Sequence, residues 1–225
     1  MSERSERADG PGDVADVTGG GERVREPAGE NRAAADVTGE GGRTRLHADA
    51  RAVLGEWAAP TPEEELLRKE FLAHLHAHRD GMYRECVPGH LTATTAVLSH
   101  DGERVLLTLH GKAKMWFPMG GHCEPGDLSL EGVALREATE ESGIPGIRLL
   151  PGPLALDRHR VWCHPPFSHH LDVEYGAVAS AGAEAVISEE SLDLRWFPVD
   201  EIPDPTDEAT RRLVRRACEV LRSGG

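Results

Sequence analysis

The chain has 225 residues, enough for one domain of ordinary size with a substantial core. Its 25 basic and 39 acidic residues give a formal net charge of −14, which argues against a protein that binds a nucleic-acid duplex through its phosphates. No apolar run approaches the roughly 20 residues that cross a bilayer, and no secretory signal is recognisable, so we expect a cytoplasmic protein without a membrane partner. Four widely separated cysteines argue against a zinc site or a disulfide framework.

Residues 1–45 are expected to form a disordered, low-complexity tail. They contain no Leu, Ile, Phe, Tyr or Trp, and their four valines bury too little apolar surface to offset the entropy lost on ordering the chain. The segment Ala15–Arg25 returns with small changes as Ala35–Arg45. Two copies without core residues cannot stack into a solenoid, so we interpret the repeat as a duplication within a linker.

Residues 46–88 are expected to form a helical leader that packs on the core. A short helix is predicted over Leu46–Trp57, and a second over about residues 62–78. Thr61 and Glu64 have the spacing of a capping box that begins this second helix. Its apolar stripe, which needs a partner surface, consists of Leu67, Phe71 and Leu75.

The pattern then changes to strands. Residues 91–98 and 104–110 flank a turn and predict a hairpin. A loop rich in Gly and Pro, residues 118–126, leads into a helix at about 130–142. The further elements expected are strands at 147–156, 170–180 and 192–199 and a last helix that starts at Thr206. This interleaving predicts an α/β fold with a mixed sheet between helices.

Three carboxylates crowd the end of the helix predicted at 130–142. Glu137, Glu140 and Glu141 have i, i+3 and i+4 spacing, so they share one face and repel one another. A helix C-terminus also disfavours anions. A hard divalent cation such as Mg²⁺ would reverse both costs, whereas the alternative interpretation is a solvated acidic helix end. Arg136 precedes Glu140 by four residues and is placed to orient a carboxylate.

The stretch from Gly120 to Ile144 resembles the signature of the Nudix hydrolases, G-x5-E-x7-R-E-U-x-E-E-x-G-U, where U is a bulky aliphatic residue. Gly121 matches the first glycine, and residues 136–144 match the second half, with the small Ala138 at the first U position. Asp127 stands where the first Glu is expected, and eight residues instead of seven separate it from Arg136. These two departures leave the role of Asp127 open.

The resemblance covers residues 89–222, the expected Nudix hydrolase domain. It implies a Nudix-type α/β/α sandwich with a mixed sheet, here with an N-terminal helical extension. It also implies a hydrolase that uses Mg²⁺ or Mn²⁺ to cleave the diphosphate linkage of a nucleoside diphosphate derivative. The partner would be a small nucleotide-type substrate, and the protein a monomer or a homodimer.

The resemblance also assigns roles within the site. The metal ligands would be the carboxylates of Glu137, Glu140 and Glu141 and the backbone carbonyl of Gly121, with Arg136 as the residue that orients them. A further carboxylate often comes from the loop before the last strand. Glu190 is the best-placed candidate and Glu189 is its neighbour, although both fit ordinary loop acids equally well. The general base is either one of the helix glutamates or this loop glutamate.

Aromatic and histidine residues supply candidates for substrate contacts. Trp116 and Phe117 could stack on a base or belong to the core. His122, together with His90 and His110, could bind phosphate or serve the structure alone. A further group, His169 and His170 with Asp172, resembles a metal cluster, but neighbours in a strand point to opposite faces and cannot share one ion.

Two alternatives from other functional classes remain. One is a Nudix-fold nucleotide sensor that binds without hydrolysis, which loss of the helix glutamates would favour; all three are present. The other is isopentenyl diphosphate isomerase, which shares the fold but needs a catalytic cysteine in a sequence context that this chain lacks.

Overall fold

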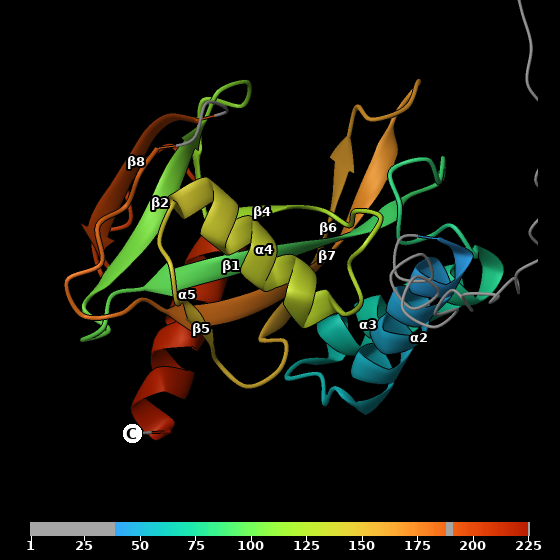
Figure 1. Cartoon of the computed structure of the whole chain (residues 1–225), viewed down its shortest axis with the longest axis horizontal. Helices are drawn as coiled ribbons and strands as arrows, with labels where there is room; N and C mark the ends of the chain where they lie inside the picture. Colours follow the sequence, from blue (N-terminus) through green and yellow to red (C-terminus); the bar gives the residue numbers. More distant parts are fainter. Residues whose placement is uncertain (1–38, 188–190, 225) are drawn as a thin grey trace, which may run out of the picture.

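A computed structural model of the chain describes residues 39–187 and 191–224 (Figure 1). Most of the predicted tail therefore lies outside the described residues. Helix α2 (Glu40–Glu56) begins earlier than predicted, so residues 40–45, assigned to the tail from the sequence, are helical. Its buried face repeats every four residues and includes Gly42 and Leu46. Gly42 has no side chain, so the sequence pattern did not reveal this first turn. Within the described part of the chain, no helix combines the length and apolarity that a membrane crossing requires.

One mixed sheet of eight strands forms the centre of the described structure. Strand β1 (His90–Leu98) lies in the middle and runs parallel to β7 (Ser168–Val178), with His90 opposite His170. Its hairpin partner, β2 (Arg104–His110), is antiparallel. The remaining strands are β3 (Trp116–Phe117), β4 (Met119–His122), β5 (Arg148–Leu149), β6 (Ala155–Val161) and β8 (Ser191–Pro198). The predicted α/β fold with a mixed sheet is confirmed.

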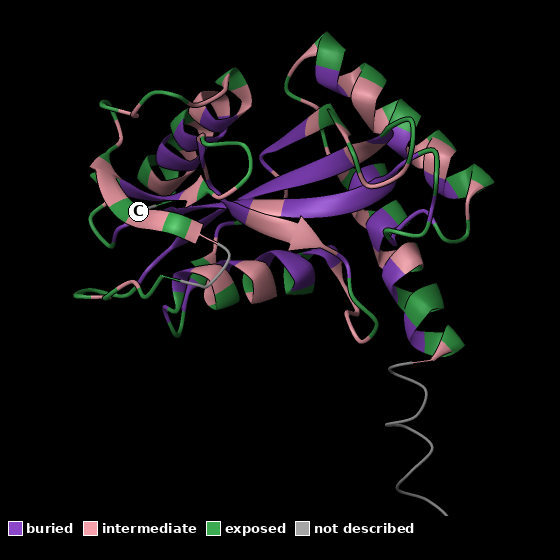
Figure 2. Cartoon of the chain, turned by 90° about the horizontal axis from the view of Figure 1, so that it is seen from above, coloured by how far each residue is buried: buried purple, intermediate pink, exposed green. Residues whose placement is uncertain are grey.

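Successive residues of β1 face different helices. The hydroxyl of Thr95 donates to a carbonyl of α4 (Leu130–Ser142) at 3.1 Å. Leu98 lies on the other face and packs with Leu213 of α5 (Glu208–Ser223). The two helices therefore cover opposite faces of the sheet, with α4 in front and α5 behind in Figure 1. Figure 2 shows the central strands buried and the outer helix faces exposed, as the expected α/β/α sandwich requires.

The single strand predicted over residues 147–156 is wrong. The structure has the short β5 there, and β6 begins only at Ala155. Gly152 between them has a φ of +64°, and the flanking prolines lack the N–H that a strand ladder needs. The interior of β6, residues 157–160, is polar and partly exposed, so it carries no apolar alternation that the sequence could reveal. The segment predicted as a loop, residues 118–126, also differs: its residues 119–122 form β4, and β3 lies directly before it.

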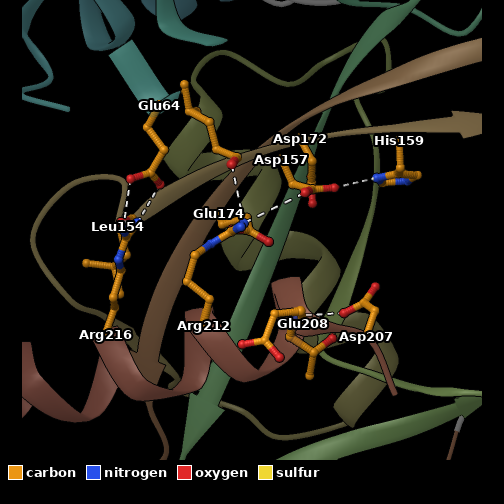
Figure 3. A network of polar contacts seen from close by, with 12 residues as sticks. Glu64, Leu154, Asp157, His159, Asp172, Glu174, Asp207, Glu208, Arg212 and Arg216 are labelled. Carbon is orange, nitrogen blue, oxygen red and sulfur yellow. Dashed lines mark hydrogen bonds and ion pairs between the residues drawn. The ribbon is translucent and has the colours of Figure 1, made fainter. Parts of the chain in front are cut away.

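The second leader helix, α3 (Pro62–Ala77), attaches to the core through a buried ion pair. The Thr61 hydroxyl accepts a hydrogen bond from the amide of Glu64 at 3.2 Å, as the capping box predicted. The carboxylate of Glu64 also receives two hydrogen bonds from the guanidinium of Arg216 in α5, one of them 2.8 Å long (Figure 3). Phe71, fully buried, belongs to the same cluster as Tyr175 of β7. The leader thus shares a hydrophobic cluster with the sheet.

Helix α2 makes two further polar contacts with the core. The indole N–H of Trp57 donates to the carbonyl of Pro153 at 2.7 Å. The Asp49 carboxylate accepts a hydrogen bond from the amide of Leu130 at 2.8 Å. Leu130 is the first residue of α4, so the leader supplies a capping contact to the helix that bears the clustered glutamates.

Candidate functional site

Helix α4 has a defined beginning and end. At its start the Ser129 hydroxyl accepts a hydrogen bond from the amide of Gly132 at 3.1 Å, which satisfies one of the free donors of the first turn. At its end Gly143 adopts the left-handed conformation, with a φ of +64°. The helix therefore ends directly after the acidic turn. Gly121 of β4, which pairs with Ala93 of β1, lies against Glu137 of this helix.

The glycines of β4 allow the glutamates to approach the backbone. A Cβ atom added to Gly121 would lie 2.5 Å from Oε1 of Glu137, so a side chain at this position would displace the carboxylate. The amide of Gly120 donates to Oε2 of Glu141 at 3.0 Å. The third carboxylate, that of Glu140, is the most exposed, at 59%. Two of the three glutamates therefore directly contact β4, which we call the glycine strand because it contains Gly120 and Gly121.

Arg136 joins two of the three glutamates to each other and to β4. Its Nη1 donates to Oε1 of Glu137 at 2.9 Å and to Oε2 of Glu140 at 3.1 Å. Its Nη2 donates to the carbonyl of His122 at 2.9 Å. Burial opposes the charge, but the carboxylates of Asp127 and Glu137 raise the pKa of Arg136 above its ordinary value. The guanidinium is therefore a permanent cation among the acids.

Asp127 has a definite role in this arrangement. Its carboxylate accepts two hydrogen bonds from Arg136, at 3.1 and 3.0 Å, and a third from the amide of Glu124 at 2.7 Å. This paired geometry fixes the plane of the guanidinium. Residues 128 and 129 connect Asp127 to the start of α4. Asp127 therefore anchors Arg136, a role that the sequence left open.

The donor chemistry of the site suits a hard divalent cation. Burial raises the pKa of Glu137, and Arg136 opposes this shift. A second positive charge would stabilise the ionised carboxylate in the same way. The oxygen donors near the glycine strand are the carboxylates of Glu137, Glu140 and Glu141 and the carbonyl of Gly121, the ligand type that Mg²⁺ and Mn²⁺ prefer.

The remaining predicted site residues do not all join this group. Trp116 is only 8% exposed and its ring packs edge-on against Phe197, with centroids 4.8 Å apart, so it belongs to the core. Phe117 is partly buried and lies beside His110, at a centroid distance of 6.2 Å. His122 contributes its backbone carbonyl to Arg136, and its ring lies among other histidines. Glu190 and its neighbour Glu189 lie outside the described residues.

A row of polar residues lies on the other face of the sheet, and the sequence analysis had considered only Asp172 among them. Asp172 is buried on β7 and accepts a hydrogen bond from the hydroxyl of Thr92 at 2.8 Å. Two residues further, Glu174 receives a hydrogen bond of 2.9 Å from Arg212 of α5 (Figure 3). Burial raises the pKa of both carboxyl groups. The i, i+2 spacing of these acids in a strand was the available signal.

The same face holds a second unpredicted group. His90, His122 and His170 gather around Cys163, which lies in the loop between β6 and β7. The sequence analysis considered His90 and His122 separately and grouped His170 with His169 and Asp172, because the register that brings His90, His122 and His170 together joins segments far apart in the chain.

Comparison with known proteins identifies the domain. A family model described as NUDIX domain matches residues 89–217. A curated relative, the NAD-capped RNA hydrolase NudC of Pseudomonas syringae pv. syringae (strain B728a), is 28% identical over 137 residues. The match covers 60% of this chain and 46% of the relative, so the chain spans about half the length of the curated protein it matches.

Solved structures of similar fold include a NUDIX-family hydrolase from Clostridium perfringens, at 25% identity and a TM-score of 0.44 over 60% of this chain and 98% of that one. Another is the binary complex of a C. elegans Ap4A hydrolase, at 18% identity and a TM-score of 0.48 over 59% of this chain and 98% of that one. The family match spans more than half of the chain and includes the glycine strand and the acidic helix. The chain belongs to the Nudix family.

Proposed function

We propose that the protein is a Nudix-type pyrophosphohydrolase that cleaves the diphosphate linkage of a nucleoside diphosphate derivative with Mg²⁺ or Mn²⁺. The observation that carries this proposal is the approach of Glu137 and Glu141 to the glycine strand, with Arg136 held between Glu137, Glu140 and Asp127. An acidic helix end that served solubility alone would not need a glycine beneath a carboxylate.

The proposed ligands of the divalent cation are the carboxylates of Glu137, Glu140 and Glu141 and the carbonyl of Gly121, with Glu190 from the loop before β8 as a further ligand. When bound, such a cation neutralises charge on the phosphate oxygens and lowers the pKa of a bound water molecule. Arg136 keeps two of the carboxylates in place, and Asp127 keeps Arg136 in place. One of these glutamates would accept the proton of the attacking water.

The proposed substrate is a small nucleotide-type molecule. The curated relative is named for NAD-capped RNA, which supports a nucleotide with a bridging diphosphate as the reacting group. The net charge of −14 opposes binding of a polyanion through an extended basic surface. A local cation at the acidic site would supply the positive charge that a compact diphosphate needs.

The test is the formation of a nucleoside monophosphate, followed by chromatography, from a panel of nucleoside diphosphate derivatives in the presence of Mg²⁺ or Mn²⁺. Glu140→Gln and Glu141→Gln should each lower kcat by at least about 100-fold, because each removes a charged ligand from the reacting centre. The matched control is Glu131→Gln, an exposed glutamate in the first turn of the same helix. Circular dichroism should show unchanged melting for all three variants.

Two results would contradict the proposal. Near-wild-type turnover of both ligand variants at saturating Mg²⁺ would remove the catalytic role of the helix glutamates. Tight nucleotide binding by the wild-type protein without hydrolysis of any panel member would instead identify a nucleotide sensor.

A further inference from the structure

Four potential metal ligands meet at one end of the sheet, outside the Nudix motif. His90 begins β1, His122 ends β4, His170 lies near the start of β7, and Cys163 lies in the β6–β7 loop. One ligand atom from each residue lies within 4.8 Å of those of the other three. These side chains come from four separate segments, so their convergence is a property of the folded chain.

The strand register explains how the histidines converge. His90 and His170 are directly opposite each other in the parallel β1–β7 pair. His122 is opposite Thr92 in the antiparallel β1–β4 pair. Residues opposite each other, or two apart on one strand, share a face of the sheet, so the three imidazoles lie on one side. His169 has the opposite orientation.

The distances around the sulfur atom agree with tetrahedral coordination. Cys163 Sγ lies 3.6 Å from Nε2 of His170 and 3.8 Å from Nε2 of His122. Zinc bonds of the usual length, in a tetrahedron, give S···N edges of about 3.6 Å and N···N edges of about 3.4 Å. The ring centroids of the three imidazoles lie 4.9–5.1 Å apart. Small side-chain rotations would therefore bring the ligand atoms, now within 4.8 Å of one another, to these shorter separations.

Hydrogen bonding does not account for all four groups. The thiol of Cys163 can exchange hydrogen bonds with the rings of His122 and His170. His90 is fully buried, and neither of its ring nitrogens has a partner of hydrogen-bond geometry among the described residues. The backbone of Cys86 is near enough to favour the charged form of the ring but lies outside hydrogen-bond geometry. An interior imidazole without a full partner is costly, and a bound ligand would remove this cost.

The electrostatic surroundings keep the rings in the form that binds metal. Burial and the neighbouring His122 lower the pKa of His90 to about 4, against a weaker opposing effect of the Cys86 backbone. Burial and the adjacent histidines lower the pKa of His170 to about 2. Neutral imidazole is the ligand form. The nearby His159 is engaged by Asp157 at 2.9 Å and stands outside the donor set.

We propose that His90, His122, Cys163 and His170 bind one Zn²⁺ ion in a tetrahedral site of three nitrogens and one sulfur. Imidazole and thiolate donors suit zinc, whereas the oxygen donors of the acidic helix suit Mg²⁺, so the two sites select different ions. On binding, the Cys163 thiol releases its proton to solvent as the metal–sulfur bond forms. Four protein ligands fill the coordination sphere, so the ion has a structural role.

The site would join β1, β7 and the β6–β7 loop to the end of β4, the glycine strand. It differs from the expectation drawn from the cysteine spacing, because a single cysteine here combines with histidines from three strands. The proposal does not depend on the Nudix activity. Its ligands contribute nothing to the donor set of Glu137, Glu140 and Glu141.

The experiment uses the full chain, reduced, freed of any affinity tag and stripped of metal. Titration with Zn²⁺ against a chromophoric chelator should show one tight site per chain. Co²⁺ in its place should give the visible bands of a tetrahedral ion and a sulfur-to-cobalt charge-transfer band. Cys163→Ser and His170→Ala should each weaken Zn²⁺ binding more than about 100-fold, since substitution of residues that only hydrogen-bond to metal ligands already costs about 10–100-fold.

Two matched controls accompany these variants. His169→Ala changes the neighbouring histidine on the opposite face of β7, and Cys218→Ser removes a buried thiol of α5; both should bind Zn²⁺ as the wild type does. Glu140→Gln should also retain it, which separates this site from the acidic one. Cys163 is partly exposed in a loop, so Cys163→Ser should fold normally by circular dichroism. Absence of a tight site in the wild type, or a Co²⁺ spectrum unchanged by Cys163→Ser, would overturn the proposal.

Discussion

Gly121 is the residue on which the geometry of the acidic site depends most directly. A Cβ atom there would come within 2.5 Å of the Glu137 carboxylate. That carboxylate also accepts a hydrogen bond of 2.9 Å from Arg136, which restricts its freedom to move away. The glycine of the motif is thus required by the close approach of the Glu137 carboxylate to the backbone, since its φ lies outside the left-handed region.

We expect Gly121→Ala to lower kcat by at least about 10-fold, because a displacement of about 1 Å at a reacting centre can cost 100-fold. The Mg²⁺ concentration needed for half-maximal activity should rise, while the melting temperature changes little. Gly55→Ala is the control, because a Cβ there meets nothing within 4 Å. A wild-type Mg²⁺ dependence in Gly121→Ala would show that Glu137 does not bind the ion.

At the scale of elements, α3 depends on one buried aromatic residue. Phe71 is fully buried beside Leu75, whereas Leu66 on the same helix is 68% exposed. We expect Phe71→Ala to lower the free energy of unfolding by about 3–5 kcal/mol through lost burial and the cavity left behind. Leu66→Ala should stay within about 0.5 kcal/mol of the wild type. Denaturant unfolding measures both.

Light scattering decides whether this stripe serves the chain itself or a second copy. Phe71→Ala should leave the oligomeric state and the metal dependence of kcat unchanged. Unaltered stability together with conversion of a dimer to a monomer would identify the stripe as an oligomer interface.

The ion pair between α3 and α5 makes the leader sensitive to pH. Burial raises the pKa of Glu64, but the hydrogen bonds and charge of Arg216 outweigh this effect, so the pKa of Glu64 lies below its ordinary value of 4.5. An acid whose pKa is lowered by folding contributes stability above its unfolded pKa, and this contribution is lost as the pH falls through the folded pKa.

We therefore expect Glu64→Gln to cost about 3 kcal/mol at pH 7, because it leaves the Arg216 charge without its partner. The difference from the wild type should begin to shrink as the pH falls below about 4.5, where the carboxylate of the unfolded chain takes up a proton, and should continue to shrink down to the lower pKa of the folded state. Unfolding by denaturant at pH 7, 5 and 4 measures this trend. Glu63→Gln, at an exposed neighbouring position, should show no such gap. A gap that is equal at all three pH values would refute the electrostatic explanation.

At the scale of the whole molecule, the boundary between dispensable and required chain lies near the start of α2. Residues 1–38 contain no Leu, Ile, Phe, Tyr or Trp. We expect their deletion to leave kcat and the melting temperature almost unchanged. Deletion of residues 1–57 should lower the melting temperature by many degrees, because it also removes the buried Leu46 and Leu54. A fall of more than a few degrees on the shorter deletion would show that the first segment docks on the domain.

The local features of this chain were readable from its sequence, and the long-range ones were not. The helix at 130–142 and its glutamates follow a spacing contained within a few turns. Strand β6 was missed because most of its residues are polar and several are exposed, so its sequence shows no apolar alternation. The histidine cluster depends on the pairing of β1 with β7, whose partners are His90 and His170. That pairing follows from the packing of the whole sheet and has no local signature.

The hydrogen bond from the Leu130 amide to Asp49 couples local opening of the first turn of α4 to that of α2. When the leader detaches, this amide loses its acceptor, so the first turn of α4 would open together with α2. The last turn has separate attachments, through Gly120 and Glu141. Native-state amide exchange should therefore divide α4 into two parts. The Leu130 amide would exchange with the amides of the leader, while the acidic turn would exchange only when the sheet itself opens.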